Sequence, residues 1–357
     1  MRPVTGLREL GTMSRDLTPE EARDRFISRR RQRQAEETVR TYGHRLDHFV
    51  RWAEEHDVEQ MSDLDGWLID EYRHARESED VSPSTVKGSM VSLKQLLEFC
   101  ERIDVVEDDL AKKVEIPKLT KDEETSDERL TAERASSLLE YFRETNAYFG
   151  HPWHAFLELA WHTGCRLGGL IALDLDDYDP DAGTVHFRHR PDLGTPLKNQ
   201  AAGERIVGIN DDAVLEALDT YIARGRTDKR DEYGREPLFA ARQGRPSDST
   251  VRGWSYLATQ PCLHQSCPHS RKRSSCDWVD RNGASKCPSS RSPHAIRTGS
   301  ITWMLNATDG DIEWVARRVN AKPDTIRRYY DKATVEEEFE NRQQKHTDSL
   351  DINDEPA

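Results

Sequence analysis

Apolar residues recur at helical spacing through the first hundred residues of the chain. In TVRTYGHRLDHFVRWAEEH, the residues Val39, Leu46 and Phe49 fall on one face of such a helix. The segment SPSTVKGSMVSLKQLLEFCERI opens with a capping serine followed by a proline, and its apolar stripe ends at Cys100. Both stripes are expected to form core, with Cys100 as a buried thiol.

These patterns divide the chain into regions of different character. A helical domain is predicted over residues 17–115, preceded by a flexible N-terminus at residues 1–16. The stretch IPKLTKDEETSDERLTAE, residues 116–133, is charged and nearly free of large apolar side chains, which is typical of a linker. Beyond it the pattern becomes mixed, so a second domain is expected at residues 134–332.

The second region combines helical and strand patterns. A helical run ends at His162, and the segments TVHFRHR (184–190) and ERIVGI (204–209) predict two strands joined by the polar loop PDLGTPLKNQAAG. A helical pattern follows in DDAVLEALDTYIARGR. Together with the helical first domain, the sequence predicts a mainly α fold with a small β-sheet, an α+β architecture.

The composition is strongly acidic. The formal net charge is −14, with 66 Asp and Glu against 52 Lys and Arg, and the mean hydropathy is −0.86. An acidic protein can be one that avoids nucleic acid, or one adapted to molar salt. Only 13 of the 52 bases are Lys, which favours the second interpretation and a halophilic origin. No run approaches 18 apolar residues, so no membrane span is predicted, and we expect a cytoplasmic protein.

Charge is unevenly distributed along the chain. Residues 251–332 carry 14 Lys and Arg against 7 Asp and Glu, whereas residues 333–357 carry 8 acids and 2 bases. The first block is a candidate polyanion-binding face. The alternative is that its charges are dispersed around the domain and bind nothing. The acidic C-terminal tail, 333–357, is expected to be disordered past about residue 343.

Four separated polar features stand out in the second region. They are Arg166 in HTGCRLGGL, Lys198 in the polar loop, His294 with Arg297 in SPHAIRTGSITWML, and the pair Tyr329 and Tyr330 in IRRYYDKAT. Taken singly, each has an ordinary explanation as a surface or packing residue. An H-x-x-R pair also occurs by chance in many chains of this length.

In this order, however, the four features resemble the tyrosine recombinase (phage integrase) family, of archaeal halophilic type. TGCRLGGLIALDLDDYD resembles the family's first box, Lys198 matches its hairpin lysine, SPHAIRTGSITWML resembles its H-x-x-R box, and VNAKPDTIRRYYD resembles its final box. The resemblance covers residues 17–332. It implies that the helical first domain is a DNA-binding, core-binding domain and that residues 134–332 form a catalytic domain.

The resemblance implies a site-specific DNA recombinase that breaks and rejoins strands. Two arginines and a histidine donor can stabilise the charge that spreads over phosphate oxygens during cleavage. A tyrosine beside such cations has a lowered pKa and can attack, and a lysine can protonate the leaving oxygen. By resemblance these are Arg166, Arg297, His294, Tyr330 and Lys198. The resemblance also implies a 3′-phosphotyrosyl product and a reaction without ATP or a catalytic metal. The implied partner is double-stranded DNA, on which the chain forms a homo-tetramer.

Two departures from the family pattern favour an alternative. The first box has Gly169 in place of an acidic residue, and the final box has Val319-Asn320 in place of Gly-His. Asn320 keeps an amide donor but cannot act as an acid or base. The alternative function is therefore a non-catalytic or weakly active DNA-binding protein on the same scaffold. Pro323 fits the longer form of the final box, which places the nucleophile on Tyr330 and leaves Tyr329 as a packing residue.

A cysteine-rich insertion, residues 261–290, precedes the H-x-x-R box. Its cysteines follow a C-x4-C-x8-C-x10-C spacing and are Cys262, Cys267, Cys276 and Cys287. Clustered thiolates predict a structural zinc site, in which His264 or His269 can replace one cysteine. Unliganded thiols and a redox role are the alternatives. The expected role is to stiffen a basic segment, and a zinc-containing interaction protein without a DNA role is a third functional hypothesis.

Overall fold

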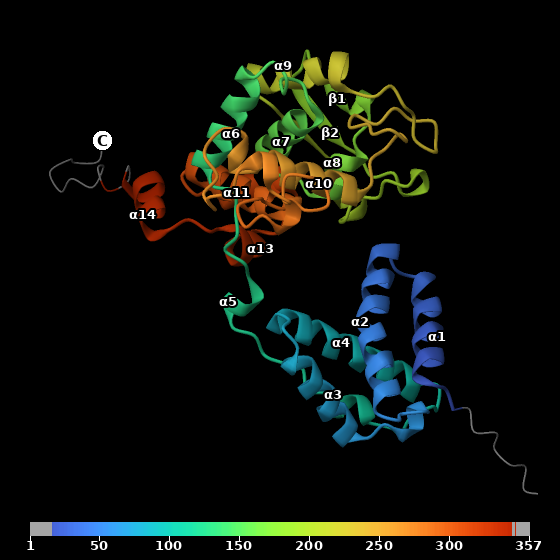
Figure 1. Ribbon diagram of the computed structural model, residues 1–357. Helices are drawn as coiled ribbons and strands as arrows, with labels where there is room; N and C mark the ends of the chain where they lie inside the picture. Colours follow the sequence, from blue (N-terminus) through green and yellow to red (C-terminus); the bar gives the residue numbers. More distant parts are fainter. Residues whose placement is uncertain (1–15, 345–346, 348–357) are drawn as a thin grey trace, which may run out of the picture. The chain divides into compact units, whose positions relative to one another are not determined.

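The computed structural model describes residues 16–344 and residue 347 (Figure 1). It separates into two compact units, Met1–Ser126 and Asp127–Ala357, and the division falls within the polar stretch 116–133. The predictions of a flexible N-terminus and a disordered end of the tail lie outside the described residues, apart from Asp16, Gln344 and Thr347.

The first unit is helical. Its elements are α1 (Pro19–Arg31), α2 (Glu36–Glu55), η1 (Met61–Asp63), α3 (Gly66–Ser78), α4 (Pro83–Glu101), η2 (Leu110–Lys113) and α5 (Lys121–Glu124), where η1 and η2 are short 3-10 turns. The caps expected from the sequence are present, because the Ser82 side chain accepts a hydrogen bond from the backbone N–H of Thr85 and Pro83 begins α4. Helices α1, α2 and α4 pack together (Figure 1).

The core of this unit is the apolar stripe that the sequence predicts. Leu46, Met90 and Leu93 are fully buried, and Phe49 is nearly so. Cys100 is also fully buried, as expected, and burial raises the pKa of its thiol to about 12. This thiol is therefore held in its protonated form.

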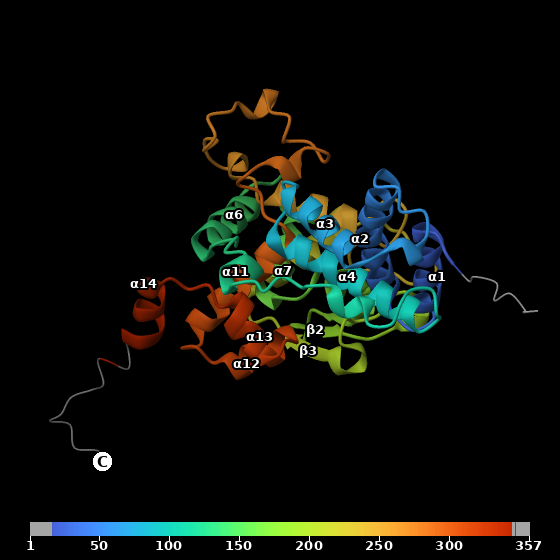
Figure 2. The ribbon, with the colours of Figure 1, turned by 90° about the horizontal axis from the view of Figure 1, so that it is seen from below.

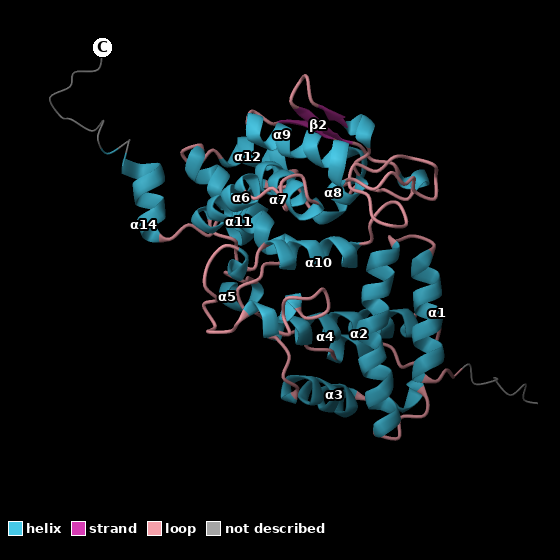
Figure 3. Cartoon of the chain, turned by 45° about the horizontal axis from the view of Figure 1, so that its top comes forward, coloured by secondary structure: helices cyan, strands magenta, loops and turns pink. Residues whose placement is uncertain are grey.

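The second unit is built around a buried central helix. Its helices are α6 (Ala132–Glu144), α7 (Pro152–Thr163), α8 (Leu167–Ala172), α9 (Asp212–Thr220), α10 (Asp248–Ala258), α11 (Pro293–Ala307), α12 (Ile312–Val319), α13 (Pro323–Thr325) and α14 (Val335–Glu338), with π-helical turns at Tyr221–Gly225, Ile326–Tyr330 and Phe339–Gln343. Helix α7 is apolar on nearly all sides and packs against α6, α9, α10 and α11 (Figure 3). It thereby sets the positions of the surrounding helices.

A small sheet completes this unit. Strands β1 (Tyr178–Asp179), β2 (Thr184–Phe187) and β3 (Arg205–Gly208) are antiparallel in that order, with Val185 opposite Val207. Both valines point into the core. The two predicted strands are confirmed but are shorter than expected. Beyond the end of β2 at Phe187, the Arg190 side chain forms an ion pair with the buried carboxylate of Asp177. The predicted fold class, mainly α with a small β-sheet, is confirmed.

The cysteine-rich insertion joins α10 to α11 and contains little regular structure. Within residues 261–290 the structure has only the 3-10 turns Pro261–Leu263, Arg273–Ser275 and Ala284–Lys286. In Figure 2 this segment, drawn in orange, forms a lobe of loops beside the helices of its own unit.

Candidate active site

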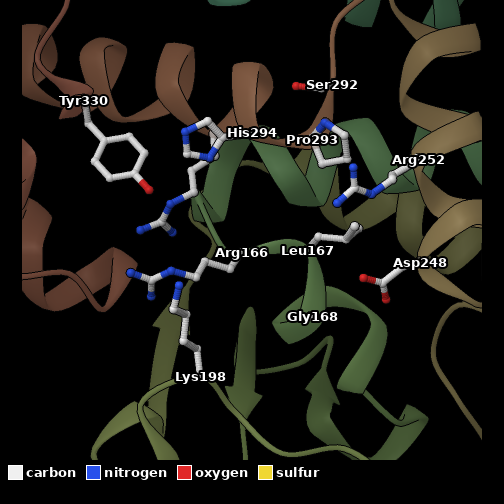
Figure 4. Close-up of a pocket in the computed structure, with 11 residues that line it drawn as sticks. Arg166, Leu167, Gly168, Lys198, Asp248, Arg252, Ser292, Pro293, His294 and Tyr330 are labelled. Carbon is white, nitrogen blue, oxygen red and sulfur yellow. The ribbon is translucent and has the colours of Figure 1, made fainter. Parts of the chain in front are cut away.

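Five of the six predicted catalytic residues line one pocket of about 310 Å³ (Figure 4). They arrive from four parts of the fold: the start of α8, the β2–β3 loop, the first turns of α11 and the π-helical turn 326–330. The complete lining is Arg166, Leu167, Gly168, Lys198, Asp248, Arg252, Ser292, Pro293, His294, Arg297 and Tyr330. The sixth predicted residue, Asn320, does not line it.

Arg166 owes its place to the turn that ends α7. Gly164 has a positive φ of 56°, which glycine adopts without strain, and the chain then turns into α8 with Arg166 at its N-cap. A Cβ at Gly164 would lie 2.9 Å from the Cγ1 atom of Val319, so a larger residue would push α12 away. The T-G-x-R pattern therefore has a packing reason as well as a chemical one.

Arg297 is buried on the inner face of α11 with an exposed fraction of 2%. Its Nη1 atom donates hydrogen bonds to the backbone oxygens of Gly164 and Val319. Its Nε and Nη2 atoms are buried and make no hydrogen bond within the described residues. Burial lowers the pKa of Arg297 below its usual value, yet a guanidinium so basic stays charged at neutral pH. A buried cation with two unused donors is costly unless an anion binds it.

Positive charge in the pocket is not neutralised by the protein. Arg166, Lys198 and Arg252 also line it, and Asp248 is the one carboxylate in the lining. In the part of the chain that the structure describes, no ion pair forms between any carboxylate and these cations or Arg297. The site therefore suits an anionic ligand with several oxygens, such as a phosphodiester.

The two adjacent tyrosines differ in their surroundings. Tyr330 is 6% exposed and Tyr329 is 36% exposed. The Tyr330 ring centroid lies 5.0 Å from the guanidinium carbon of Arg297 and 5.4 Å from the ring centroid of His294. The Thr302 hydroxyl donates to the backbone oxygen of Tyr330 over 2.8 Å, which fixes the turn. Of the two hydroxyls, that of Tyr330 belongs to the pocket.

His294 stands at the open edge of the pocket, one turn before Arg297 on α11 (Figure 4). Protein surrounds much of its ring, and the charges of Arg297, Arg166 and Lys198 lie nearby. Both effects lower the pKa of His294 from its ordinary value, with desolvation the larger. The imidazole is therefore neutral at neutral pH and keeps one acceptor and one donor nitrogen.

Asn320 is the one predicted catalytic residue that lies outside the pocket lining. It ends α12 in the left-handed conformation, with φ 51°, and its side chain points to the β2–β3 loop. Its Nδ2 donates to the Ala202 backbone oxygen over 2.8 Å, and its Oδ1 accepts from Asn199. Its backbone oxygen accepts from Arg166 Nη1 over 2.7 Å. The structure thus places the amide outside the pocket.

The absence of an acid at position 169 also has a physical reason. A Cβ on Gly169 would lie 2.5 Å from the Cys165 Sγ atom, so a larger side chain fits only if the Cys165 side chain moves. Sequence reasoning missed Asp248 and Arg252 in the pocket wall. Their i, i+4 spacing at the start of α10 was a weak signal, because charged pairs at this spacing occur on many surface helices.

The four cysteines of the insertion are not brought together. All are free, and among the described residues no group of three or more His, Cys, Asp and Glu side chains could hold a metal ion. Cys262 accepts a hydrogen bond from Arg273 over 3.0 Å, and His269 contacts the hydroxyl of Ser289. The zinc site gains no support from this arrangement and stays a prediction from the sequence.

No described helix is long and apolar enough to cross a membrane.

Known protein families match both units of this chain. The sequence model of the phage integrase family matches residues 128–336, and that of the phage integrase N-terminal SAM-like domain matches residues 24–103. The tyrosine recombinase XerD of Halalkalibacterium halodurans is 26% identical over 210 residues. That match covers 58% of this chain and 65% of the relative, so the chain spans just under two thirds of the relative's length.

Solved integrase structures share the fold. A Tn1549 transposon integrase in complex with a circular intermediate DNA has a TM-score of 0.61 at 16% identity, covering 94% of this chain and all of that one. A lambda integrase tetramer bound to a Holliday junction has a TM-score of 0.60 at 14% identity, covering 90% of this chain and 79% of that one. At these identities the likeness establishes the fold alone.

Proposed function

The chain belongs to the phage integrase family of tyrosine recombinases, and we propose that it is a site-specific DNA recombinase acting through a 3′-phosphotyrosyl intermediate. The observation that carries this proposal is the environment of Arg297. A buried guanidinium with two unused donors lies against the Tyr330 ring in a pocket whose other cations lack ion-pair partners. Such a site favours a bound phosphate beside a phenol.

Two arginines of the pocket account for binding of the scissile phosphate. The planar forks of Arg166 and Arg297 can each donate to a non-bridging oxygen of the scissile phosphate. As the fifth bond to phosphorus forms, negative charge on these oxygens grows, and donors fixed in advance stabilise that state more than the ground state. His294 adds a neutral donor at the same edge.

Cleavage is a transesterification. The Tyr330 oxygen forms a bond to phosphorus while the bond from phosphorus to the 5′-oxygen breaks. The phenolic proton passes to the neutral imidazole of His294, and the Lys198 ammonium gives a proton to the leaving 5′-oxygen. The phosphotyrosine conserves the ester's energy, so a second 5′-hydroxyl can reverse the reaction and join a new strand without ATP.

We infer that double-stranded DNA is the partner and that the helical first unit contributes to its binding. Exchange between two duplexes cuts four strands, one for each protomer. A homo-tetramer on DNA is therefore the working assembly. The solved lambda integrase tetramer on a Holliday junction is consistent with this stoichiometry.

The test is covalent capture of DNA. Because the target sequence is not defined, the substrate is a pool of labelled duplexes that carry a nick within a randomised region. We expect the wild-type chain and Tyr329→Phe to form an adduct that survives SDS, and Tyr330→Phe to form none. If the wild-type chain binds the pool but forms no adduct at any salt concentration, it is a non-catalytic DNA-binding protein and the proposal is wrong.

A further inference from the structure

Three arginines converge on the C-terminal end of α12. Arg205 Nε donates to the Arg318 backbone oxygen over 2.7 Å, and Arg297 Nη1 donates to that of Val319 over 3.1 Å. Arg166 Nη1 donates to that of Asn320 over 2.7 Å. The last carbonyls of a helix lack partners within it and carry partial negative charge, so they attract cations. The end of α12 therefore orients Arg166 and Arg297, two of the three arginines that line the pocket.

The side chain of Asn320 extends this arrangement to a second part of the site. Its amide nitrogen donates to the backbone oxygen of Ala202, and its amide oxygen accepts from the Asn199 side chain. Both partners lie in the β2–β3 loop, and Asn199 directly follows Lys198. The residue tolerates the left-handed backbone that ends the helix, as asparagine often does. One residue thus connects the arginines to the loop that carries the lysine.

Lys198 has no direct support of its own. It is exposed and makes no hydrogen bond or ion pair within the described chain. Its backbone is held on one side by Leu197, which is 8% exposed and whose N–H donates to His189 Nδ1 over 2.9 Å. On the other side the contact is Asn199 with Asn320. Without the side-chain contacts of Asn320, the segment between the lysine and β3 would be held only by local hydrogen bonds, such as that from the Gln200 N–H to the Leu197 backbone oxygen.

We propose that Asn320 is a positioning residue that holds the Lys198 loop against the pocket, and that it does not contact the DNA phosphate. The proposal rests on the function proposed above. It differs from the expectation that the Asn320 amide donates to the substrate, because the side chain lies outside the pocket lining and both its nitrogen and its oxygen have partners in the β2–β3 loop. Its consequence is specific: removing the side chain should impair protonation of the leaving group and leave phosphate binding intact.

Asn320→Gly is the sharpest variant. Glycine keeps the left-handed backbone and the carbonyl that Arg166 uses, and it removes only the two side-chain hydrogen bonds. Asn199→Ala removes one of them from the other side. Asp104→Gly is the matched control, because Asp104 is also left-handed, with φ 56°, and lies in the other unit.

The first measurement is amide hydrogen exchange in the free protein. We expect peptides covering residues 195–204 to exchange at least about fivefold faster in Asn320→Gly and Asn199→Ala, since each lost hydrogen bond held the loop. The peptide containing Arg297 and all peptides of Asp104→Gly should keep wild-type rates. Unchanged exchange in the loop overturns the proposal, and this readout needs no catalytic activity.

The second measurement compares two leaving groups. In a substrate with sulfur at the bridging 5′ position, the thiolate leaves without a proton. With normal DNA we expect Asn320→Gly to form adduct about tenfold more slowly, a partial loss of the roughly 10²- to 10⁴-fold contribution that a general acid makes. With the sulfur substrate, Asn320→Gly and Lys198→Ala should approach the wild-type rate, and Arg166→Ala should not. A defect of Asn320→Gly that persists with sulfur overturns the proposal. If the wild-type chain reacts with neither substrate, the proposed function fails, and hydrogen exchange still decides the role of Asn320.

Discussion

The pocket around Tyr330 and the cysteine-rich insertion are assembled in opposite ways. The pocket residues span positions 166 to 330, yet helices and a hairpin packed on two hydrophobic clusters, both of which contact Trp303, bring them together. The four cysteines lie within 26 residues, yet they do not converge. Closeness in sequence therefore says little about closeness in space when the intervening chain lacks packed elements.

The difference lies in what holds each backbone. Helix α11 packs on α7 and buries ten of its fifteen residues, so the positions of His294 and Arg297 follow from the helix itself. In the insertion the backbone consists of loops and 3-10 turns, and most side chains are exposed or half-buried. Rigid elements fix the relative positions of side chains, whereas loops leave them to local contacts.

The largest expected effect concerns Arg297. Arg297→Lys should lower the rate of adduct formation by about 10² to 10³-fold, because a compact ammonium lacks the planar fork that spans the Gly164 and Val319 carbonyls on one side and a phosphate on the other. The measurement is single-turnover cleavage of the nicked substrate, with exposed Arg317→Lys on α12 as control. A loss below tenfold would show that the buried guanidinium is structural.

The next prediction concerns the insertion. Cys287 is 8% exposed, so Cys287→Ser buries a hydroxyl and should lower the free energy of unfolding by about 1 kcal/mol or more. The serine variants of Cys262, Cys267 and Cys276 should each stay within about 0.5 kcal/mol of the wild type, as is usual for exposed or half-buried positions. Denaturant titration and metal analysis check this. One bound zinc per chain, with equal large losses for all four variants, would contradict it and support the zinc hypothesis.

A smaller effect tests whether the basic side chains of the insertion bind DNA, independently of any metal. Lys272 is exposed and forms no ion pair among the described residues. If it binds a phosphate, Lys272→Gln should reduce the slope of log affinity against log salt by about 1. Lys229→Gln, exposed but outside the insertion, should leave the slope unchanged. Equal slopes for both variants and the wild type would mean that the charges of the insertion do not bind DNA.

The smallest effect is a pH dependence from His294. Its pKa is lowered in the folded chain, so below about pH 6.5, the ordinary value for histidine, the unfolded chain binds a proton that the folded chain resists. The free energy of unfolding should therefore fall on acidification through this range, and His294→Gln should fall less steeply. Above pH 7 the two proteins should show no difference from this source. Parallel curves for both would contradict the assignment.

The sequence predicted the elements that packing dictates and missed details that depend on single contacts. Periodicity alone predicted the buried stripe that ends at Cys100 and identified two segments as strands. The ordered motifs indicated five of the residues that line the pocket. The strands were predicted too long because alternation does not show where backbone pairing between two strands ends. Asn320 stays a predicted site residue, and its contacts with the β2–β3 loop were missed because a motif gives a position in the chain and not the direction of a side chain.

Archaeal halophilic origin and cytoplasmic location stay predictions from composition. The acidic composition, on which the halophilic prediction rests, has one consequence for the site. In a chain of net charge −14, a pocket whose cations lack ion-pair partners is a local exception that concentrates binding of a polyanion in one place.

The central claim is that the Tyr330 hydroxyl attacks DNA. The most direct test is to trap the adduct on nicked DNA, digest protein and DNA, and locate the nucleotide-bearing tyrosine by mass spectrometry. The buried position of Tyr330 beside Arg297 and His294 predicts that the modification lies on Tyr330 alone. A nucleotide on Tyr329, which is more exposed and outside the pocket lining, would contradict the account.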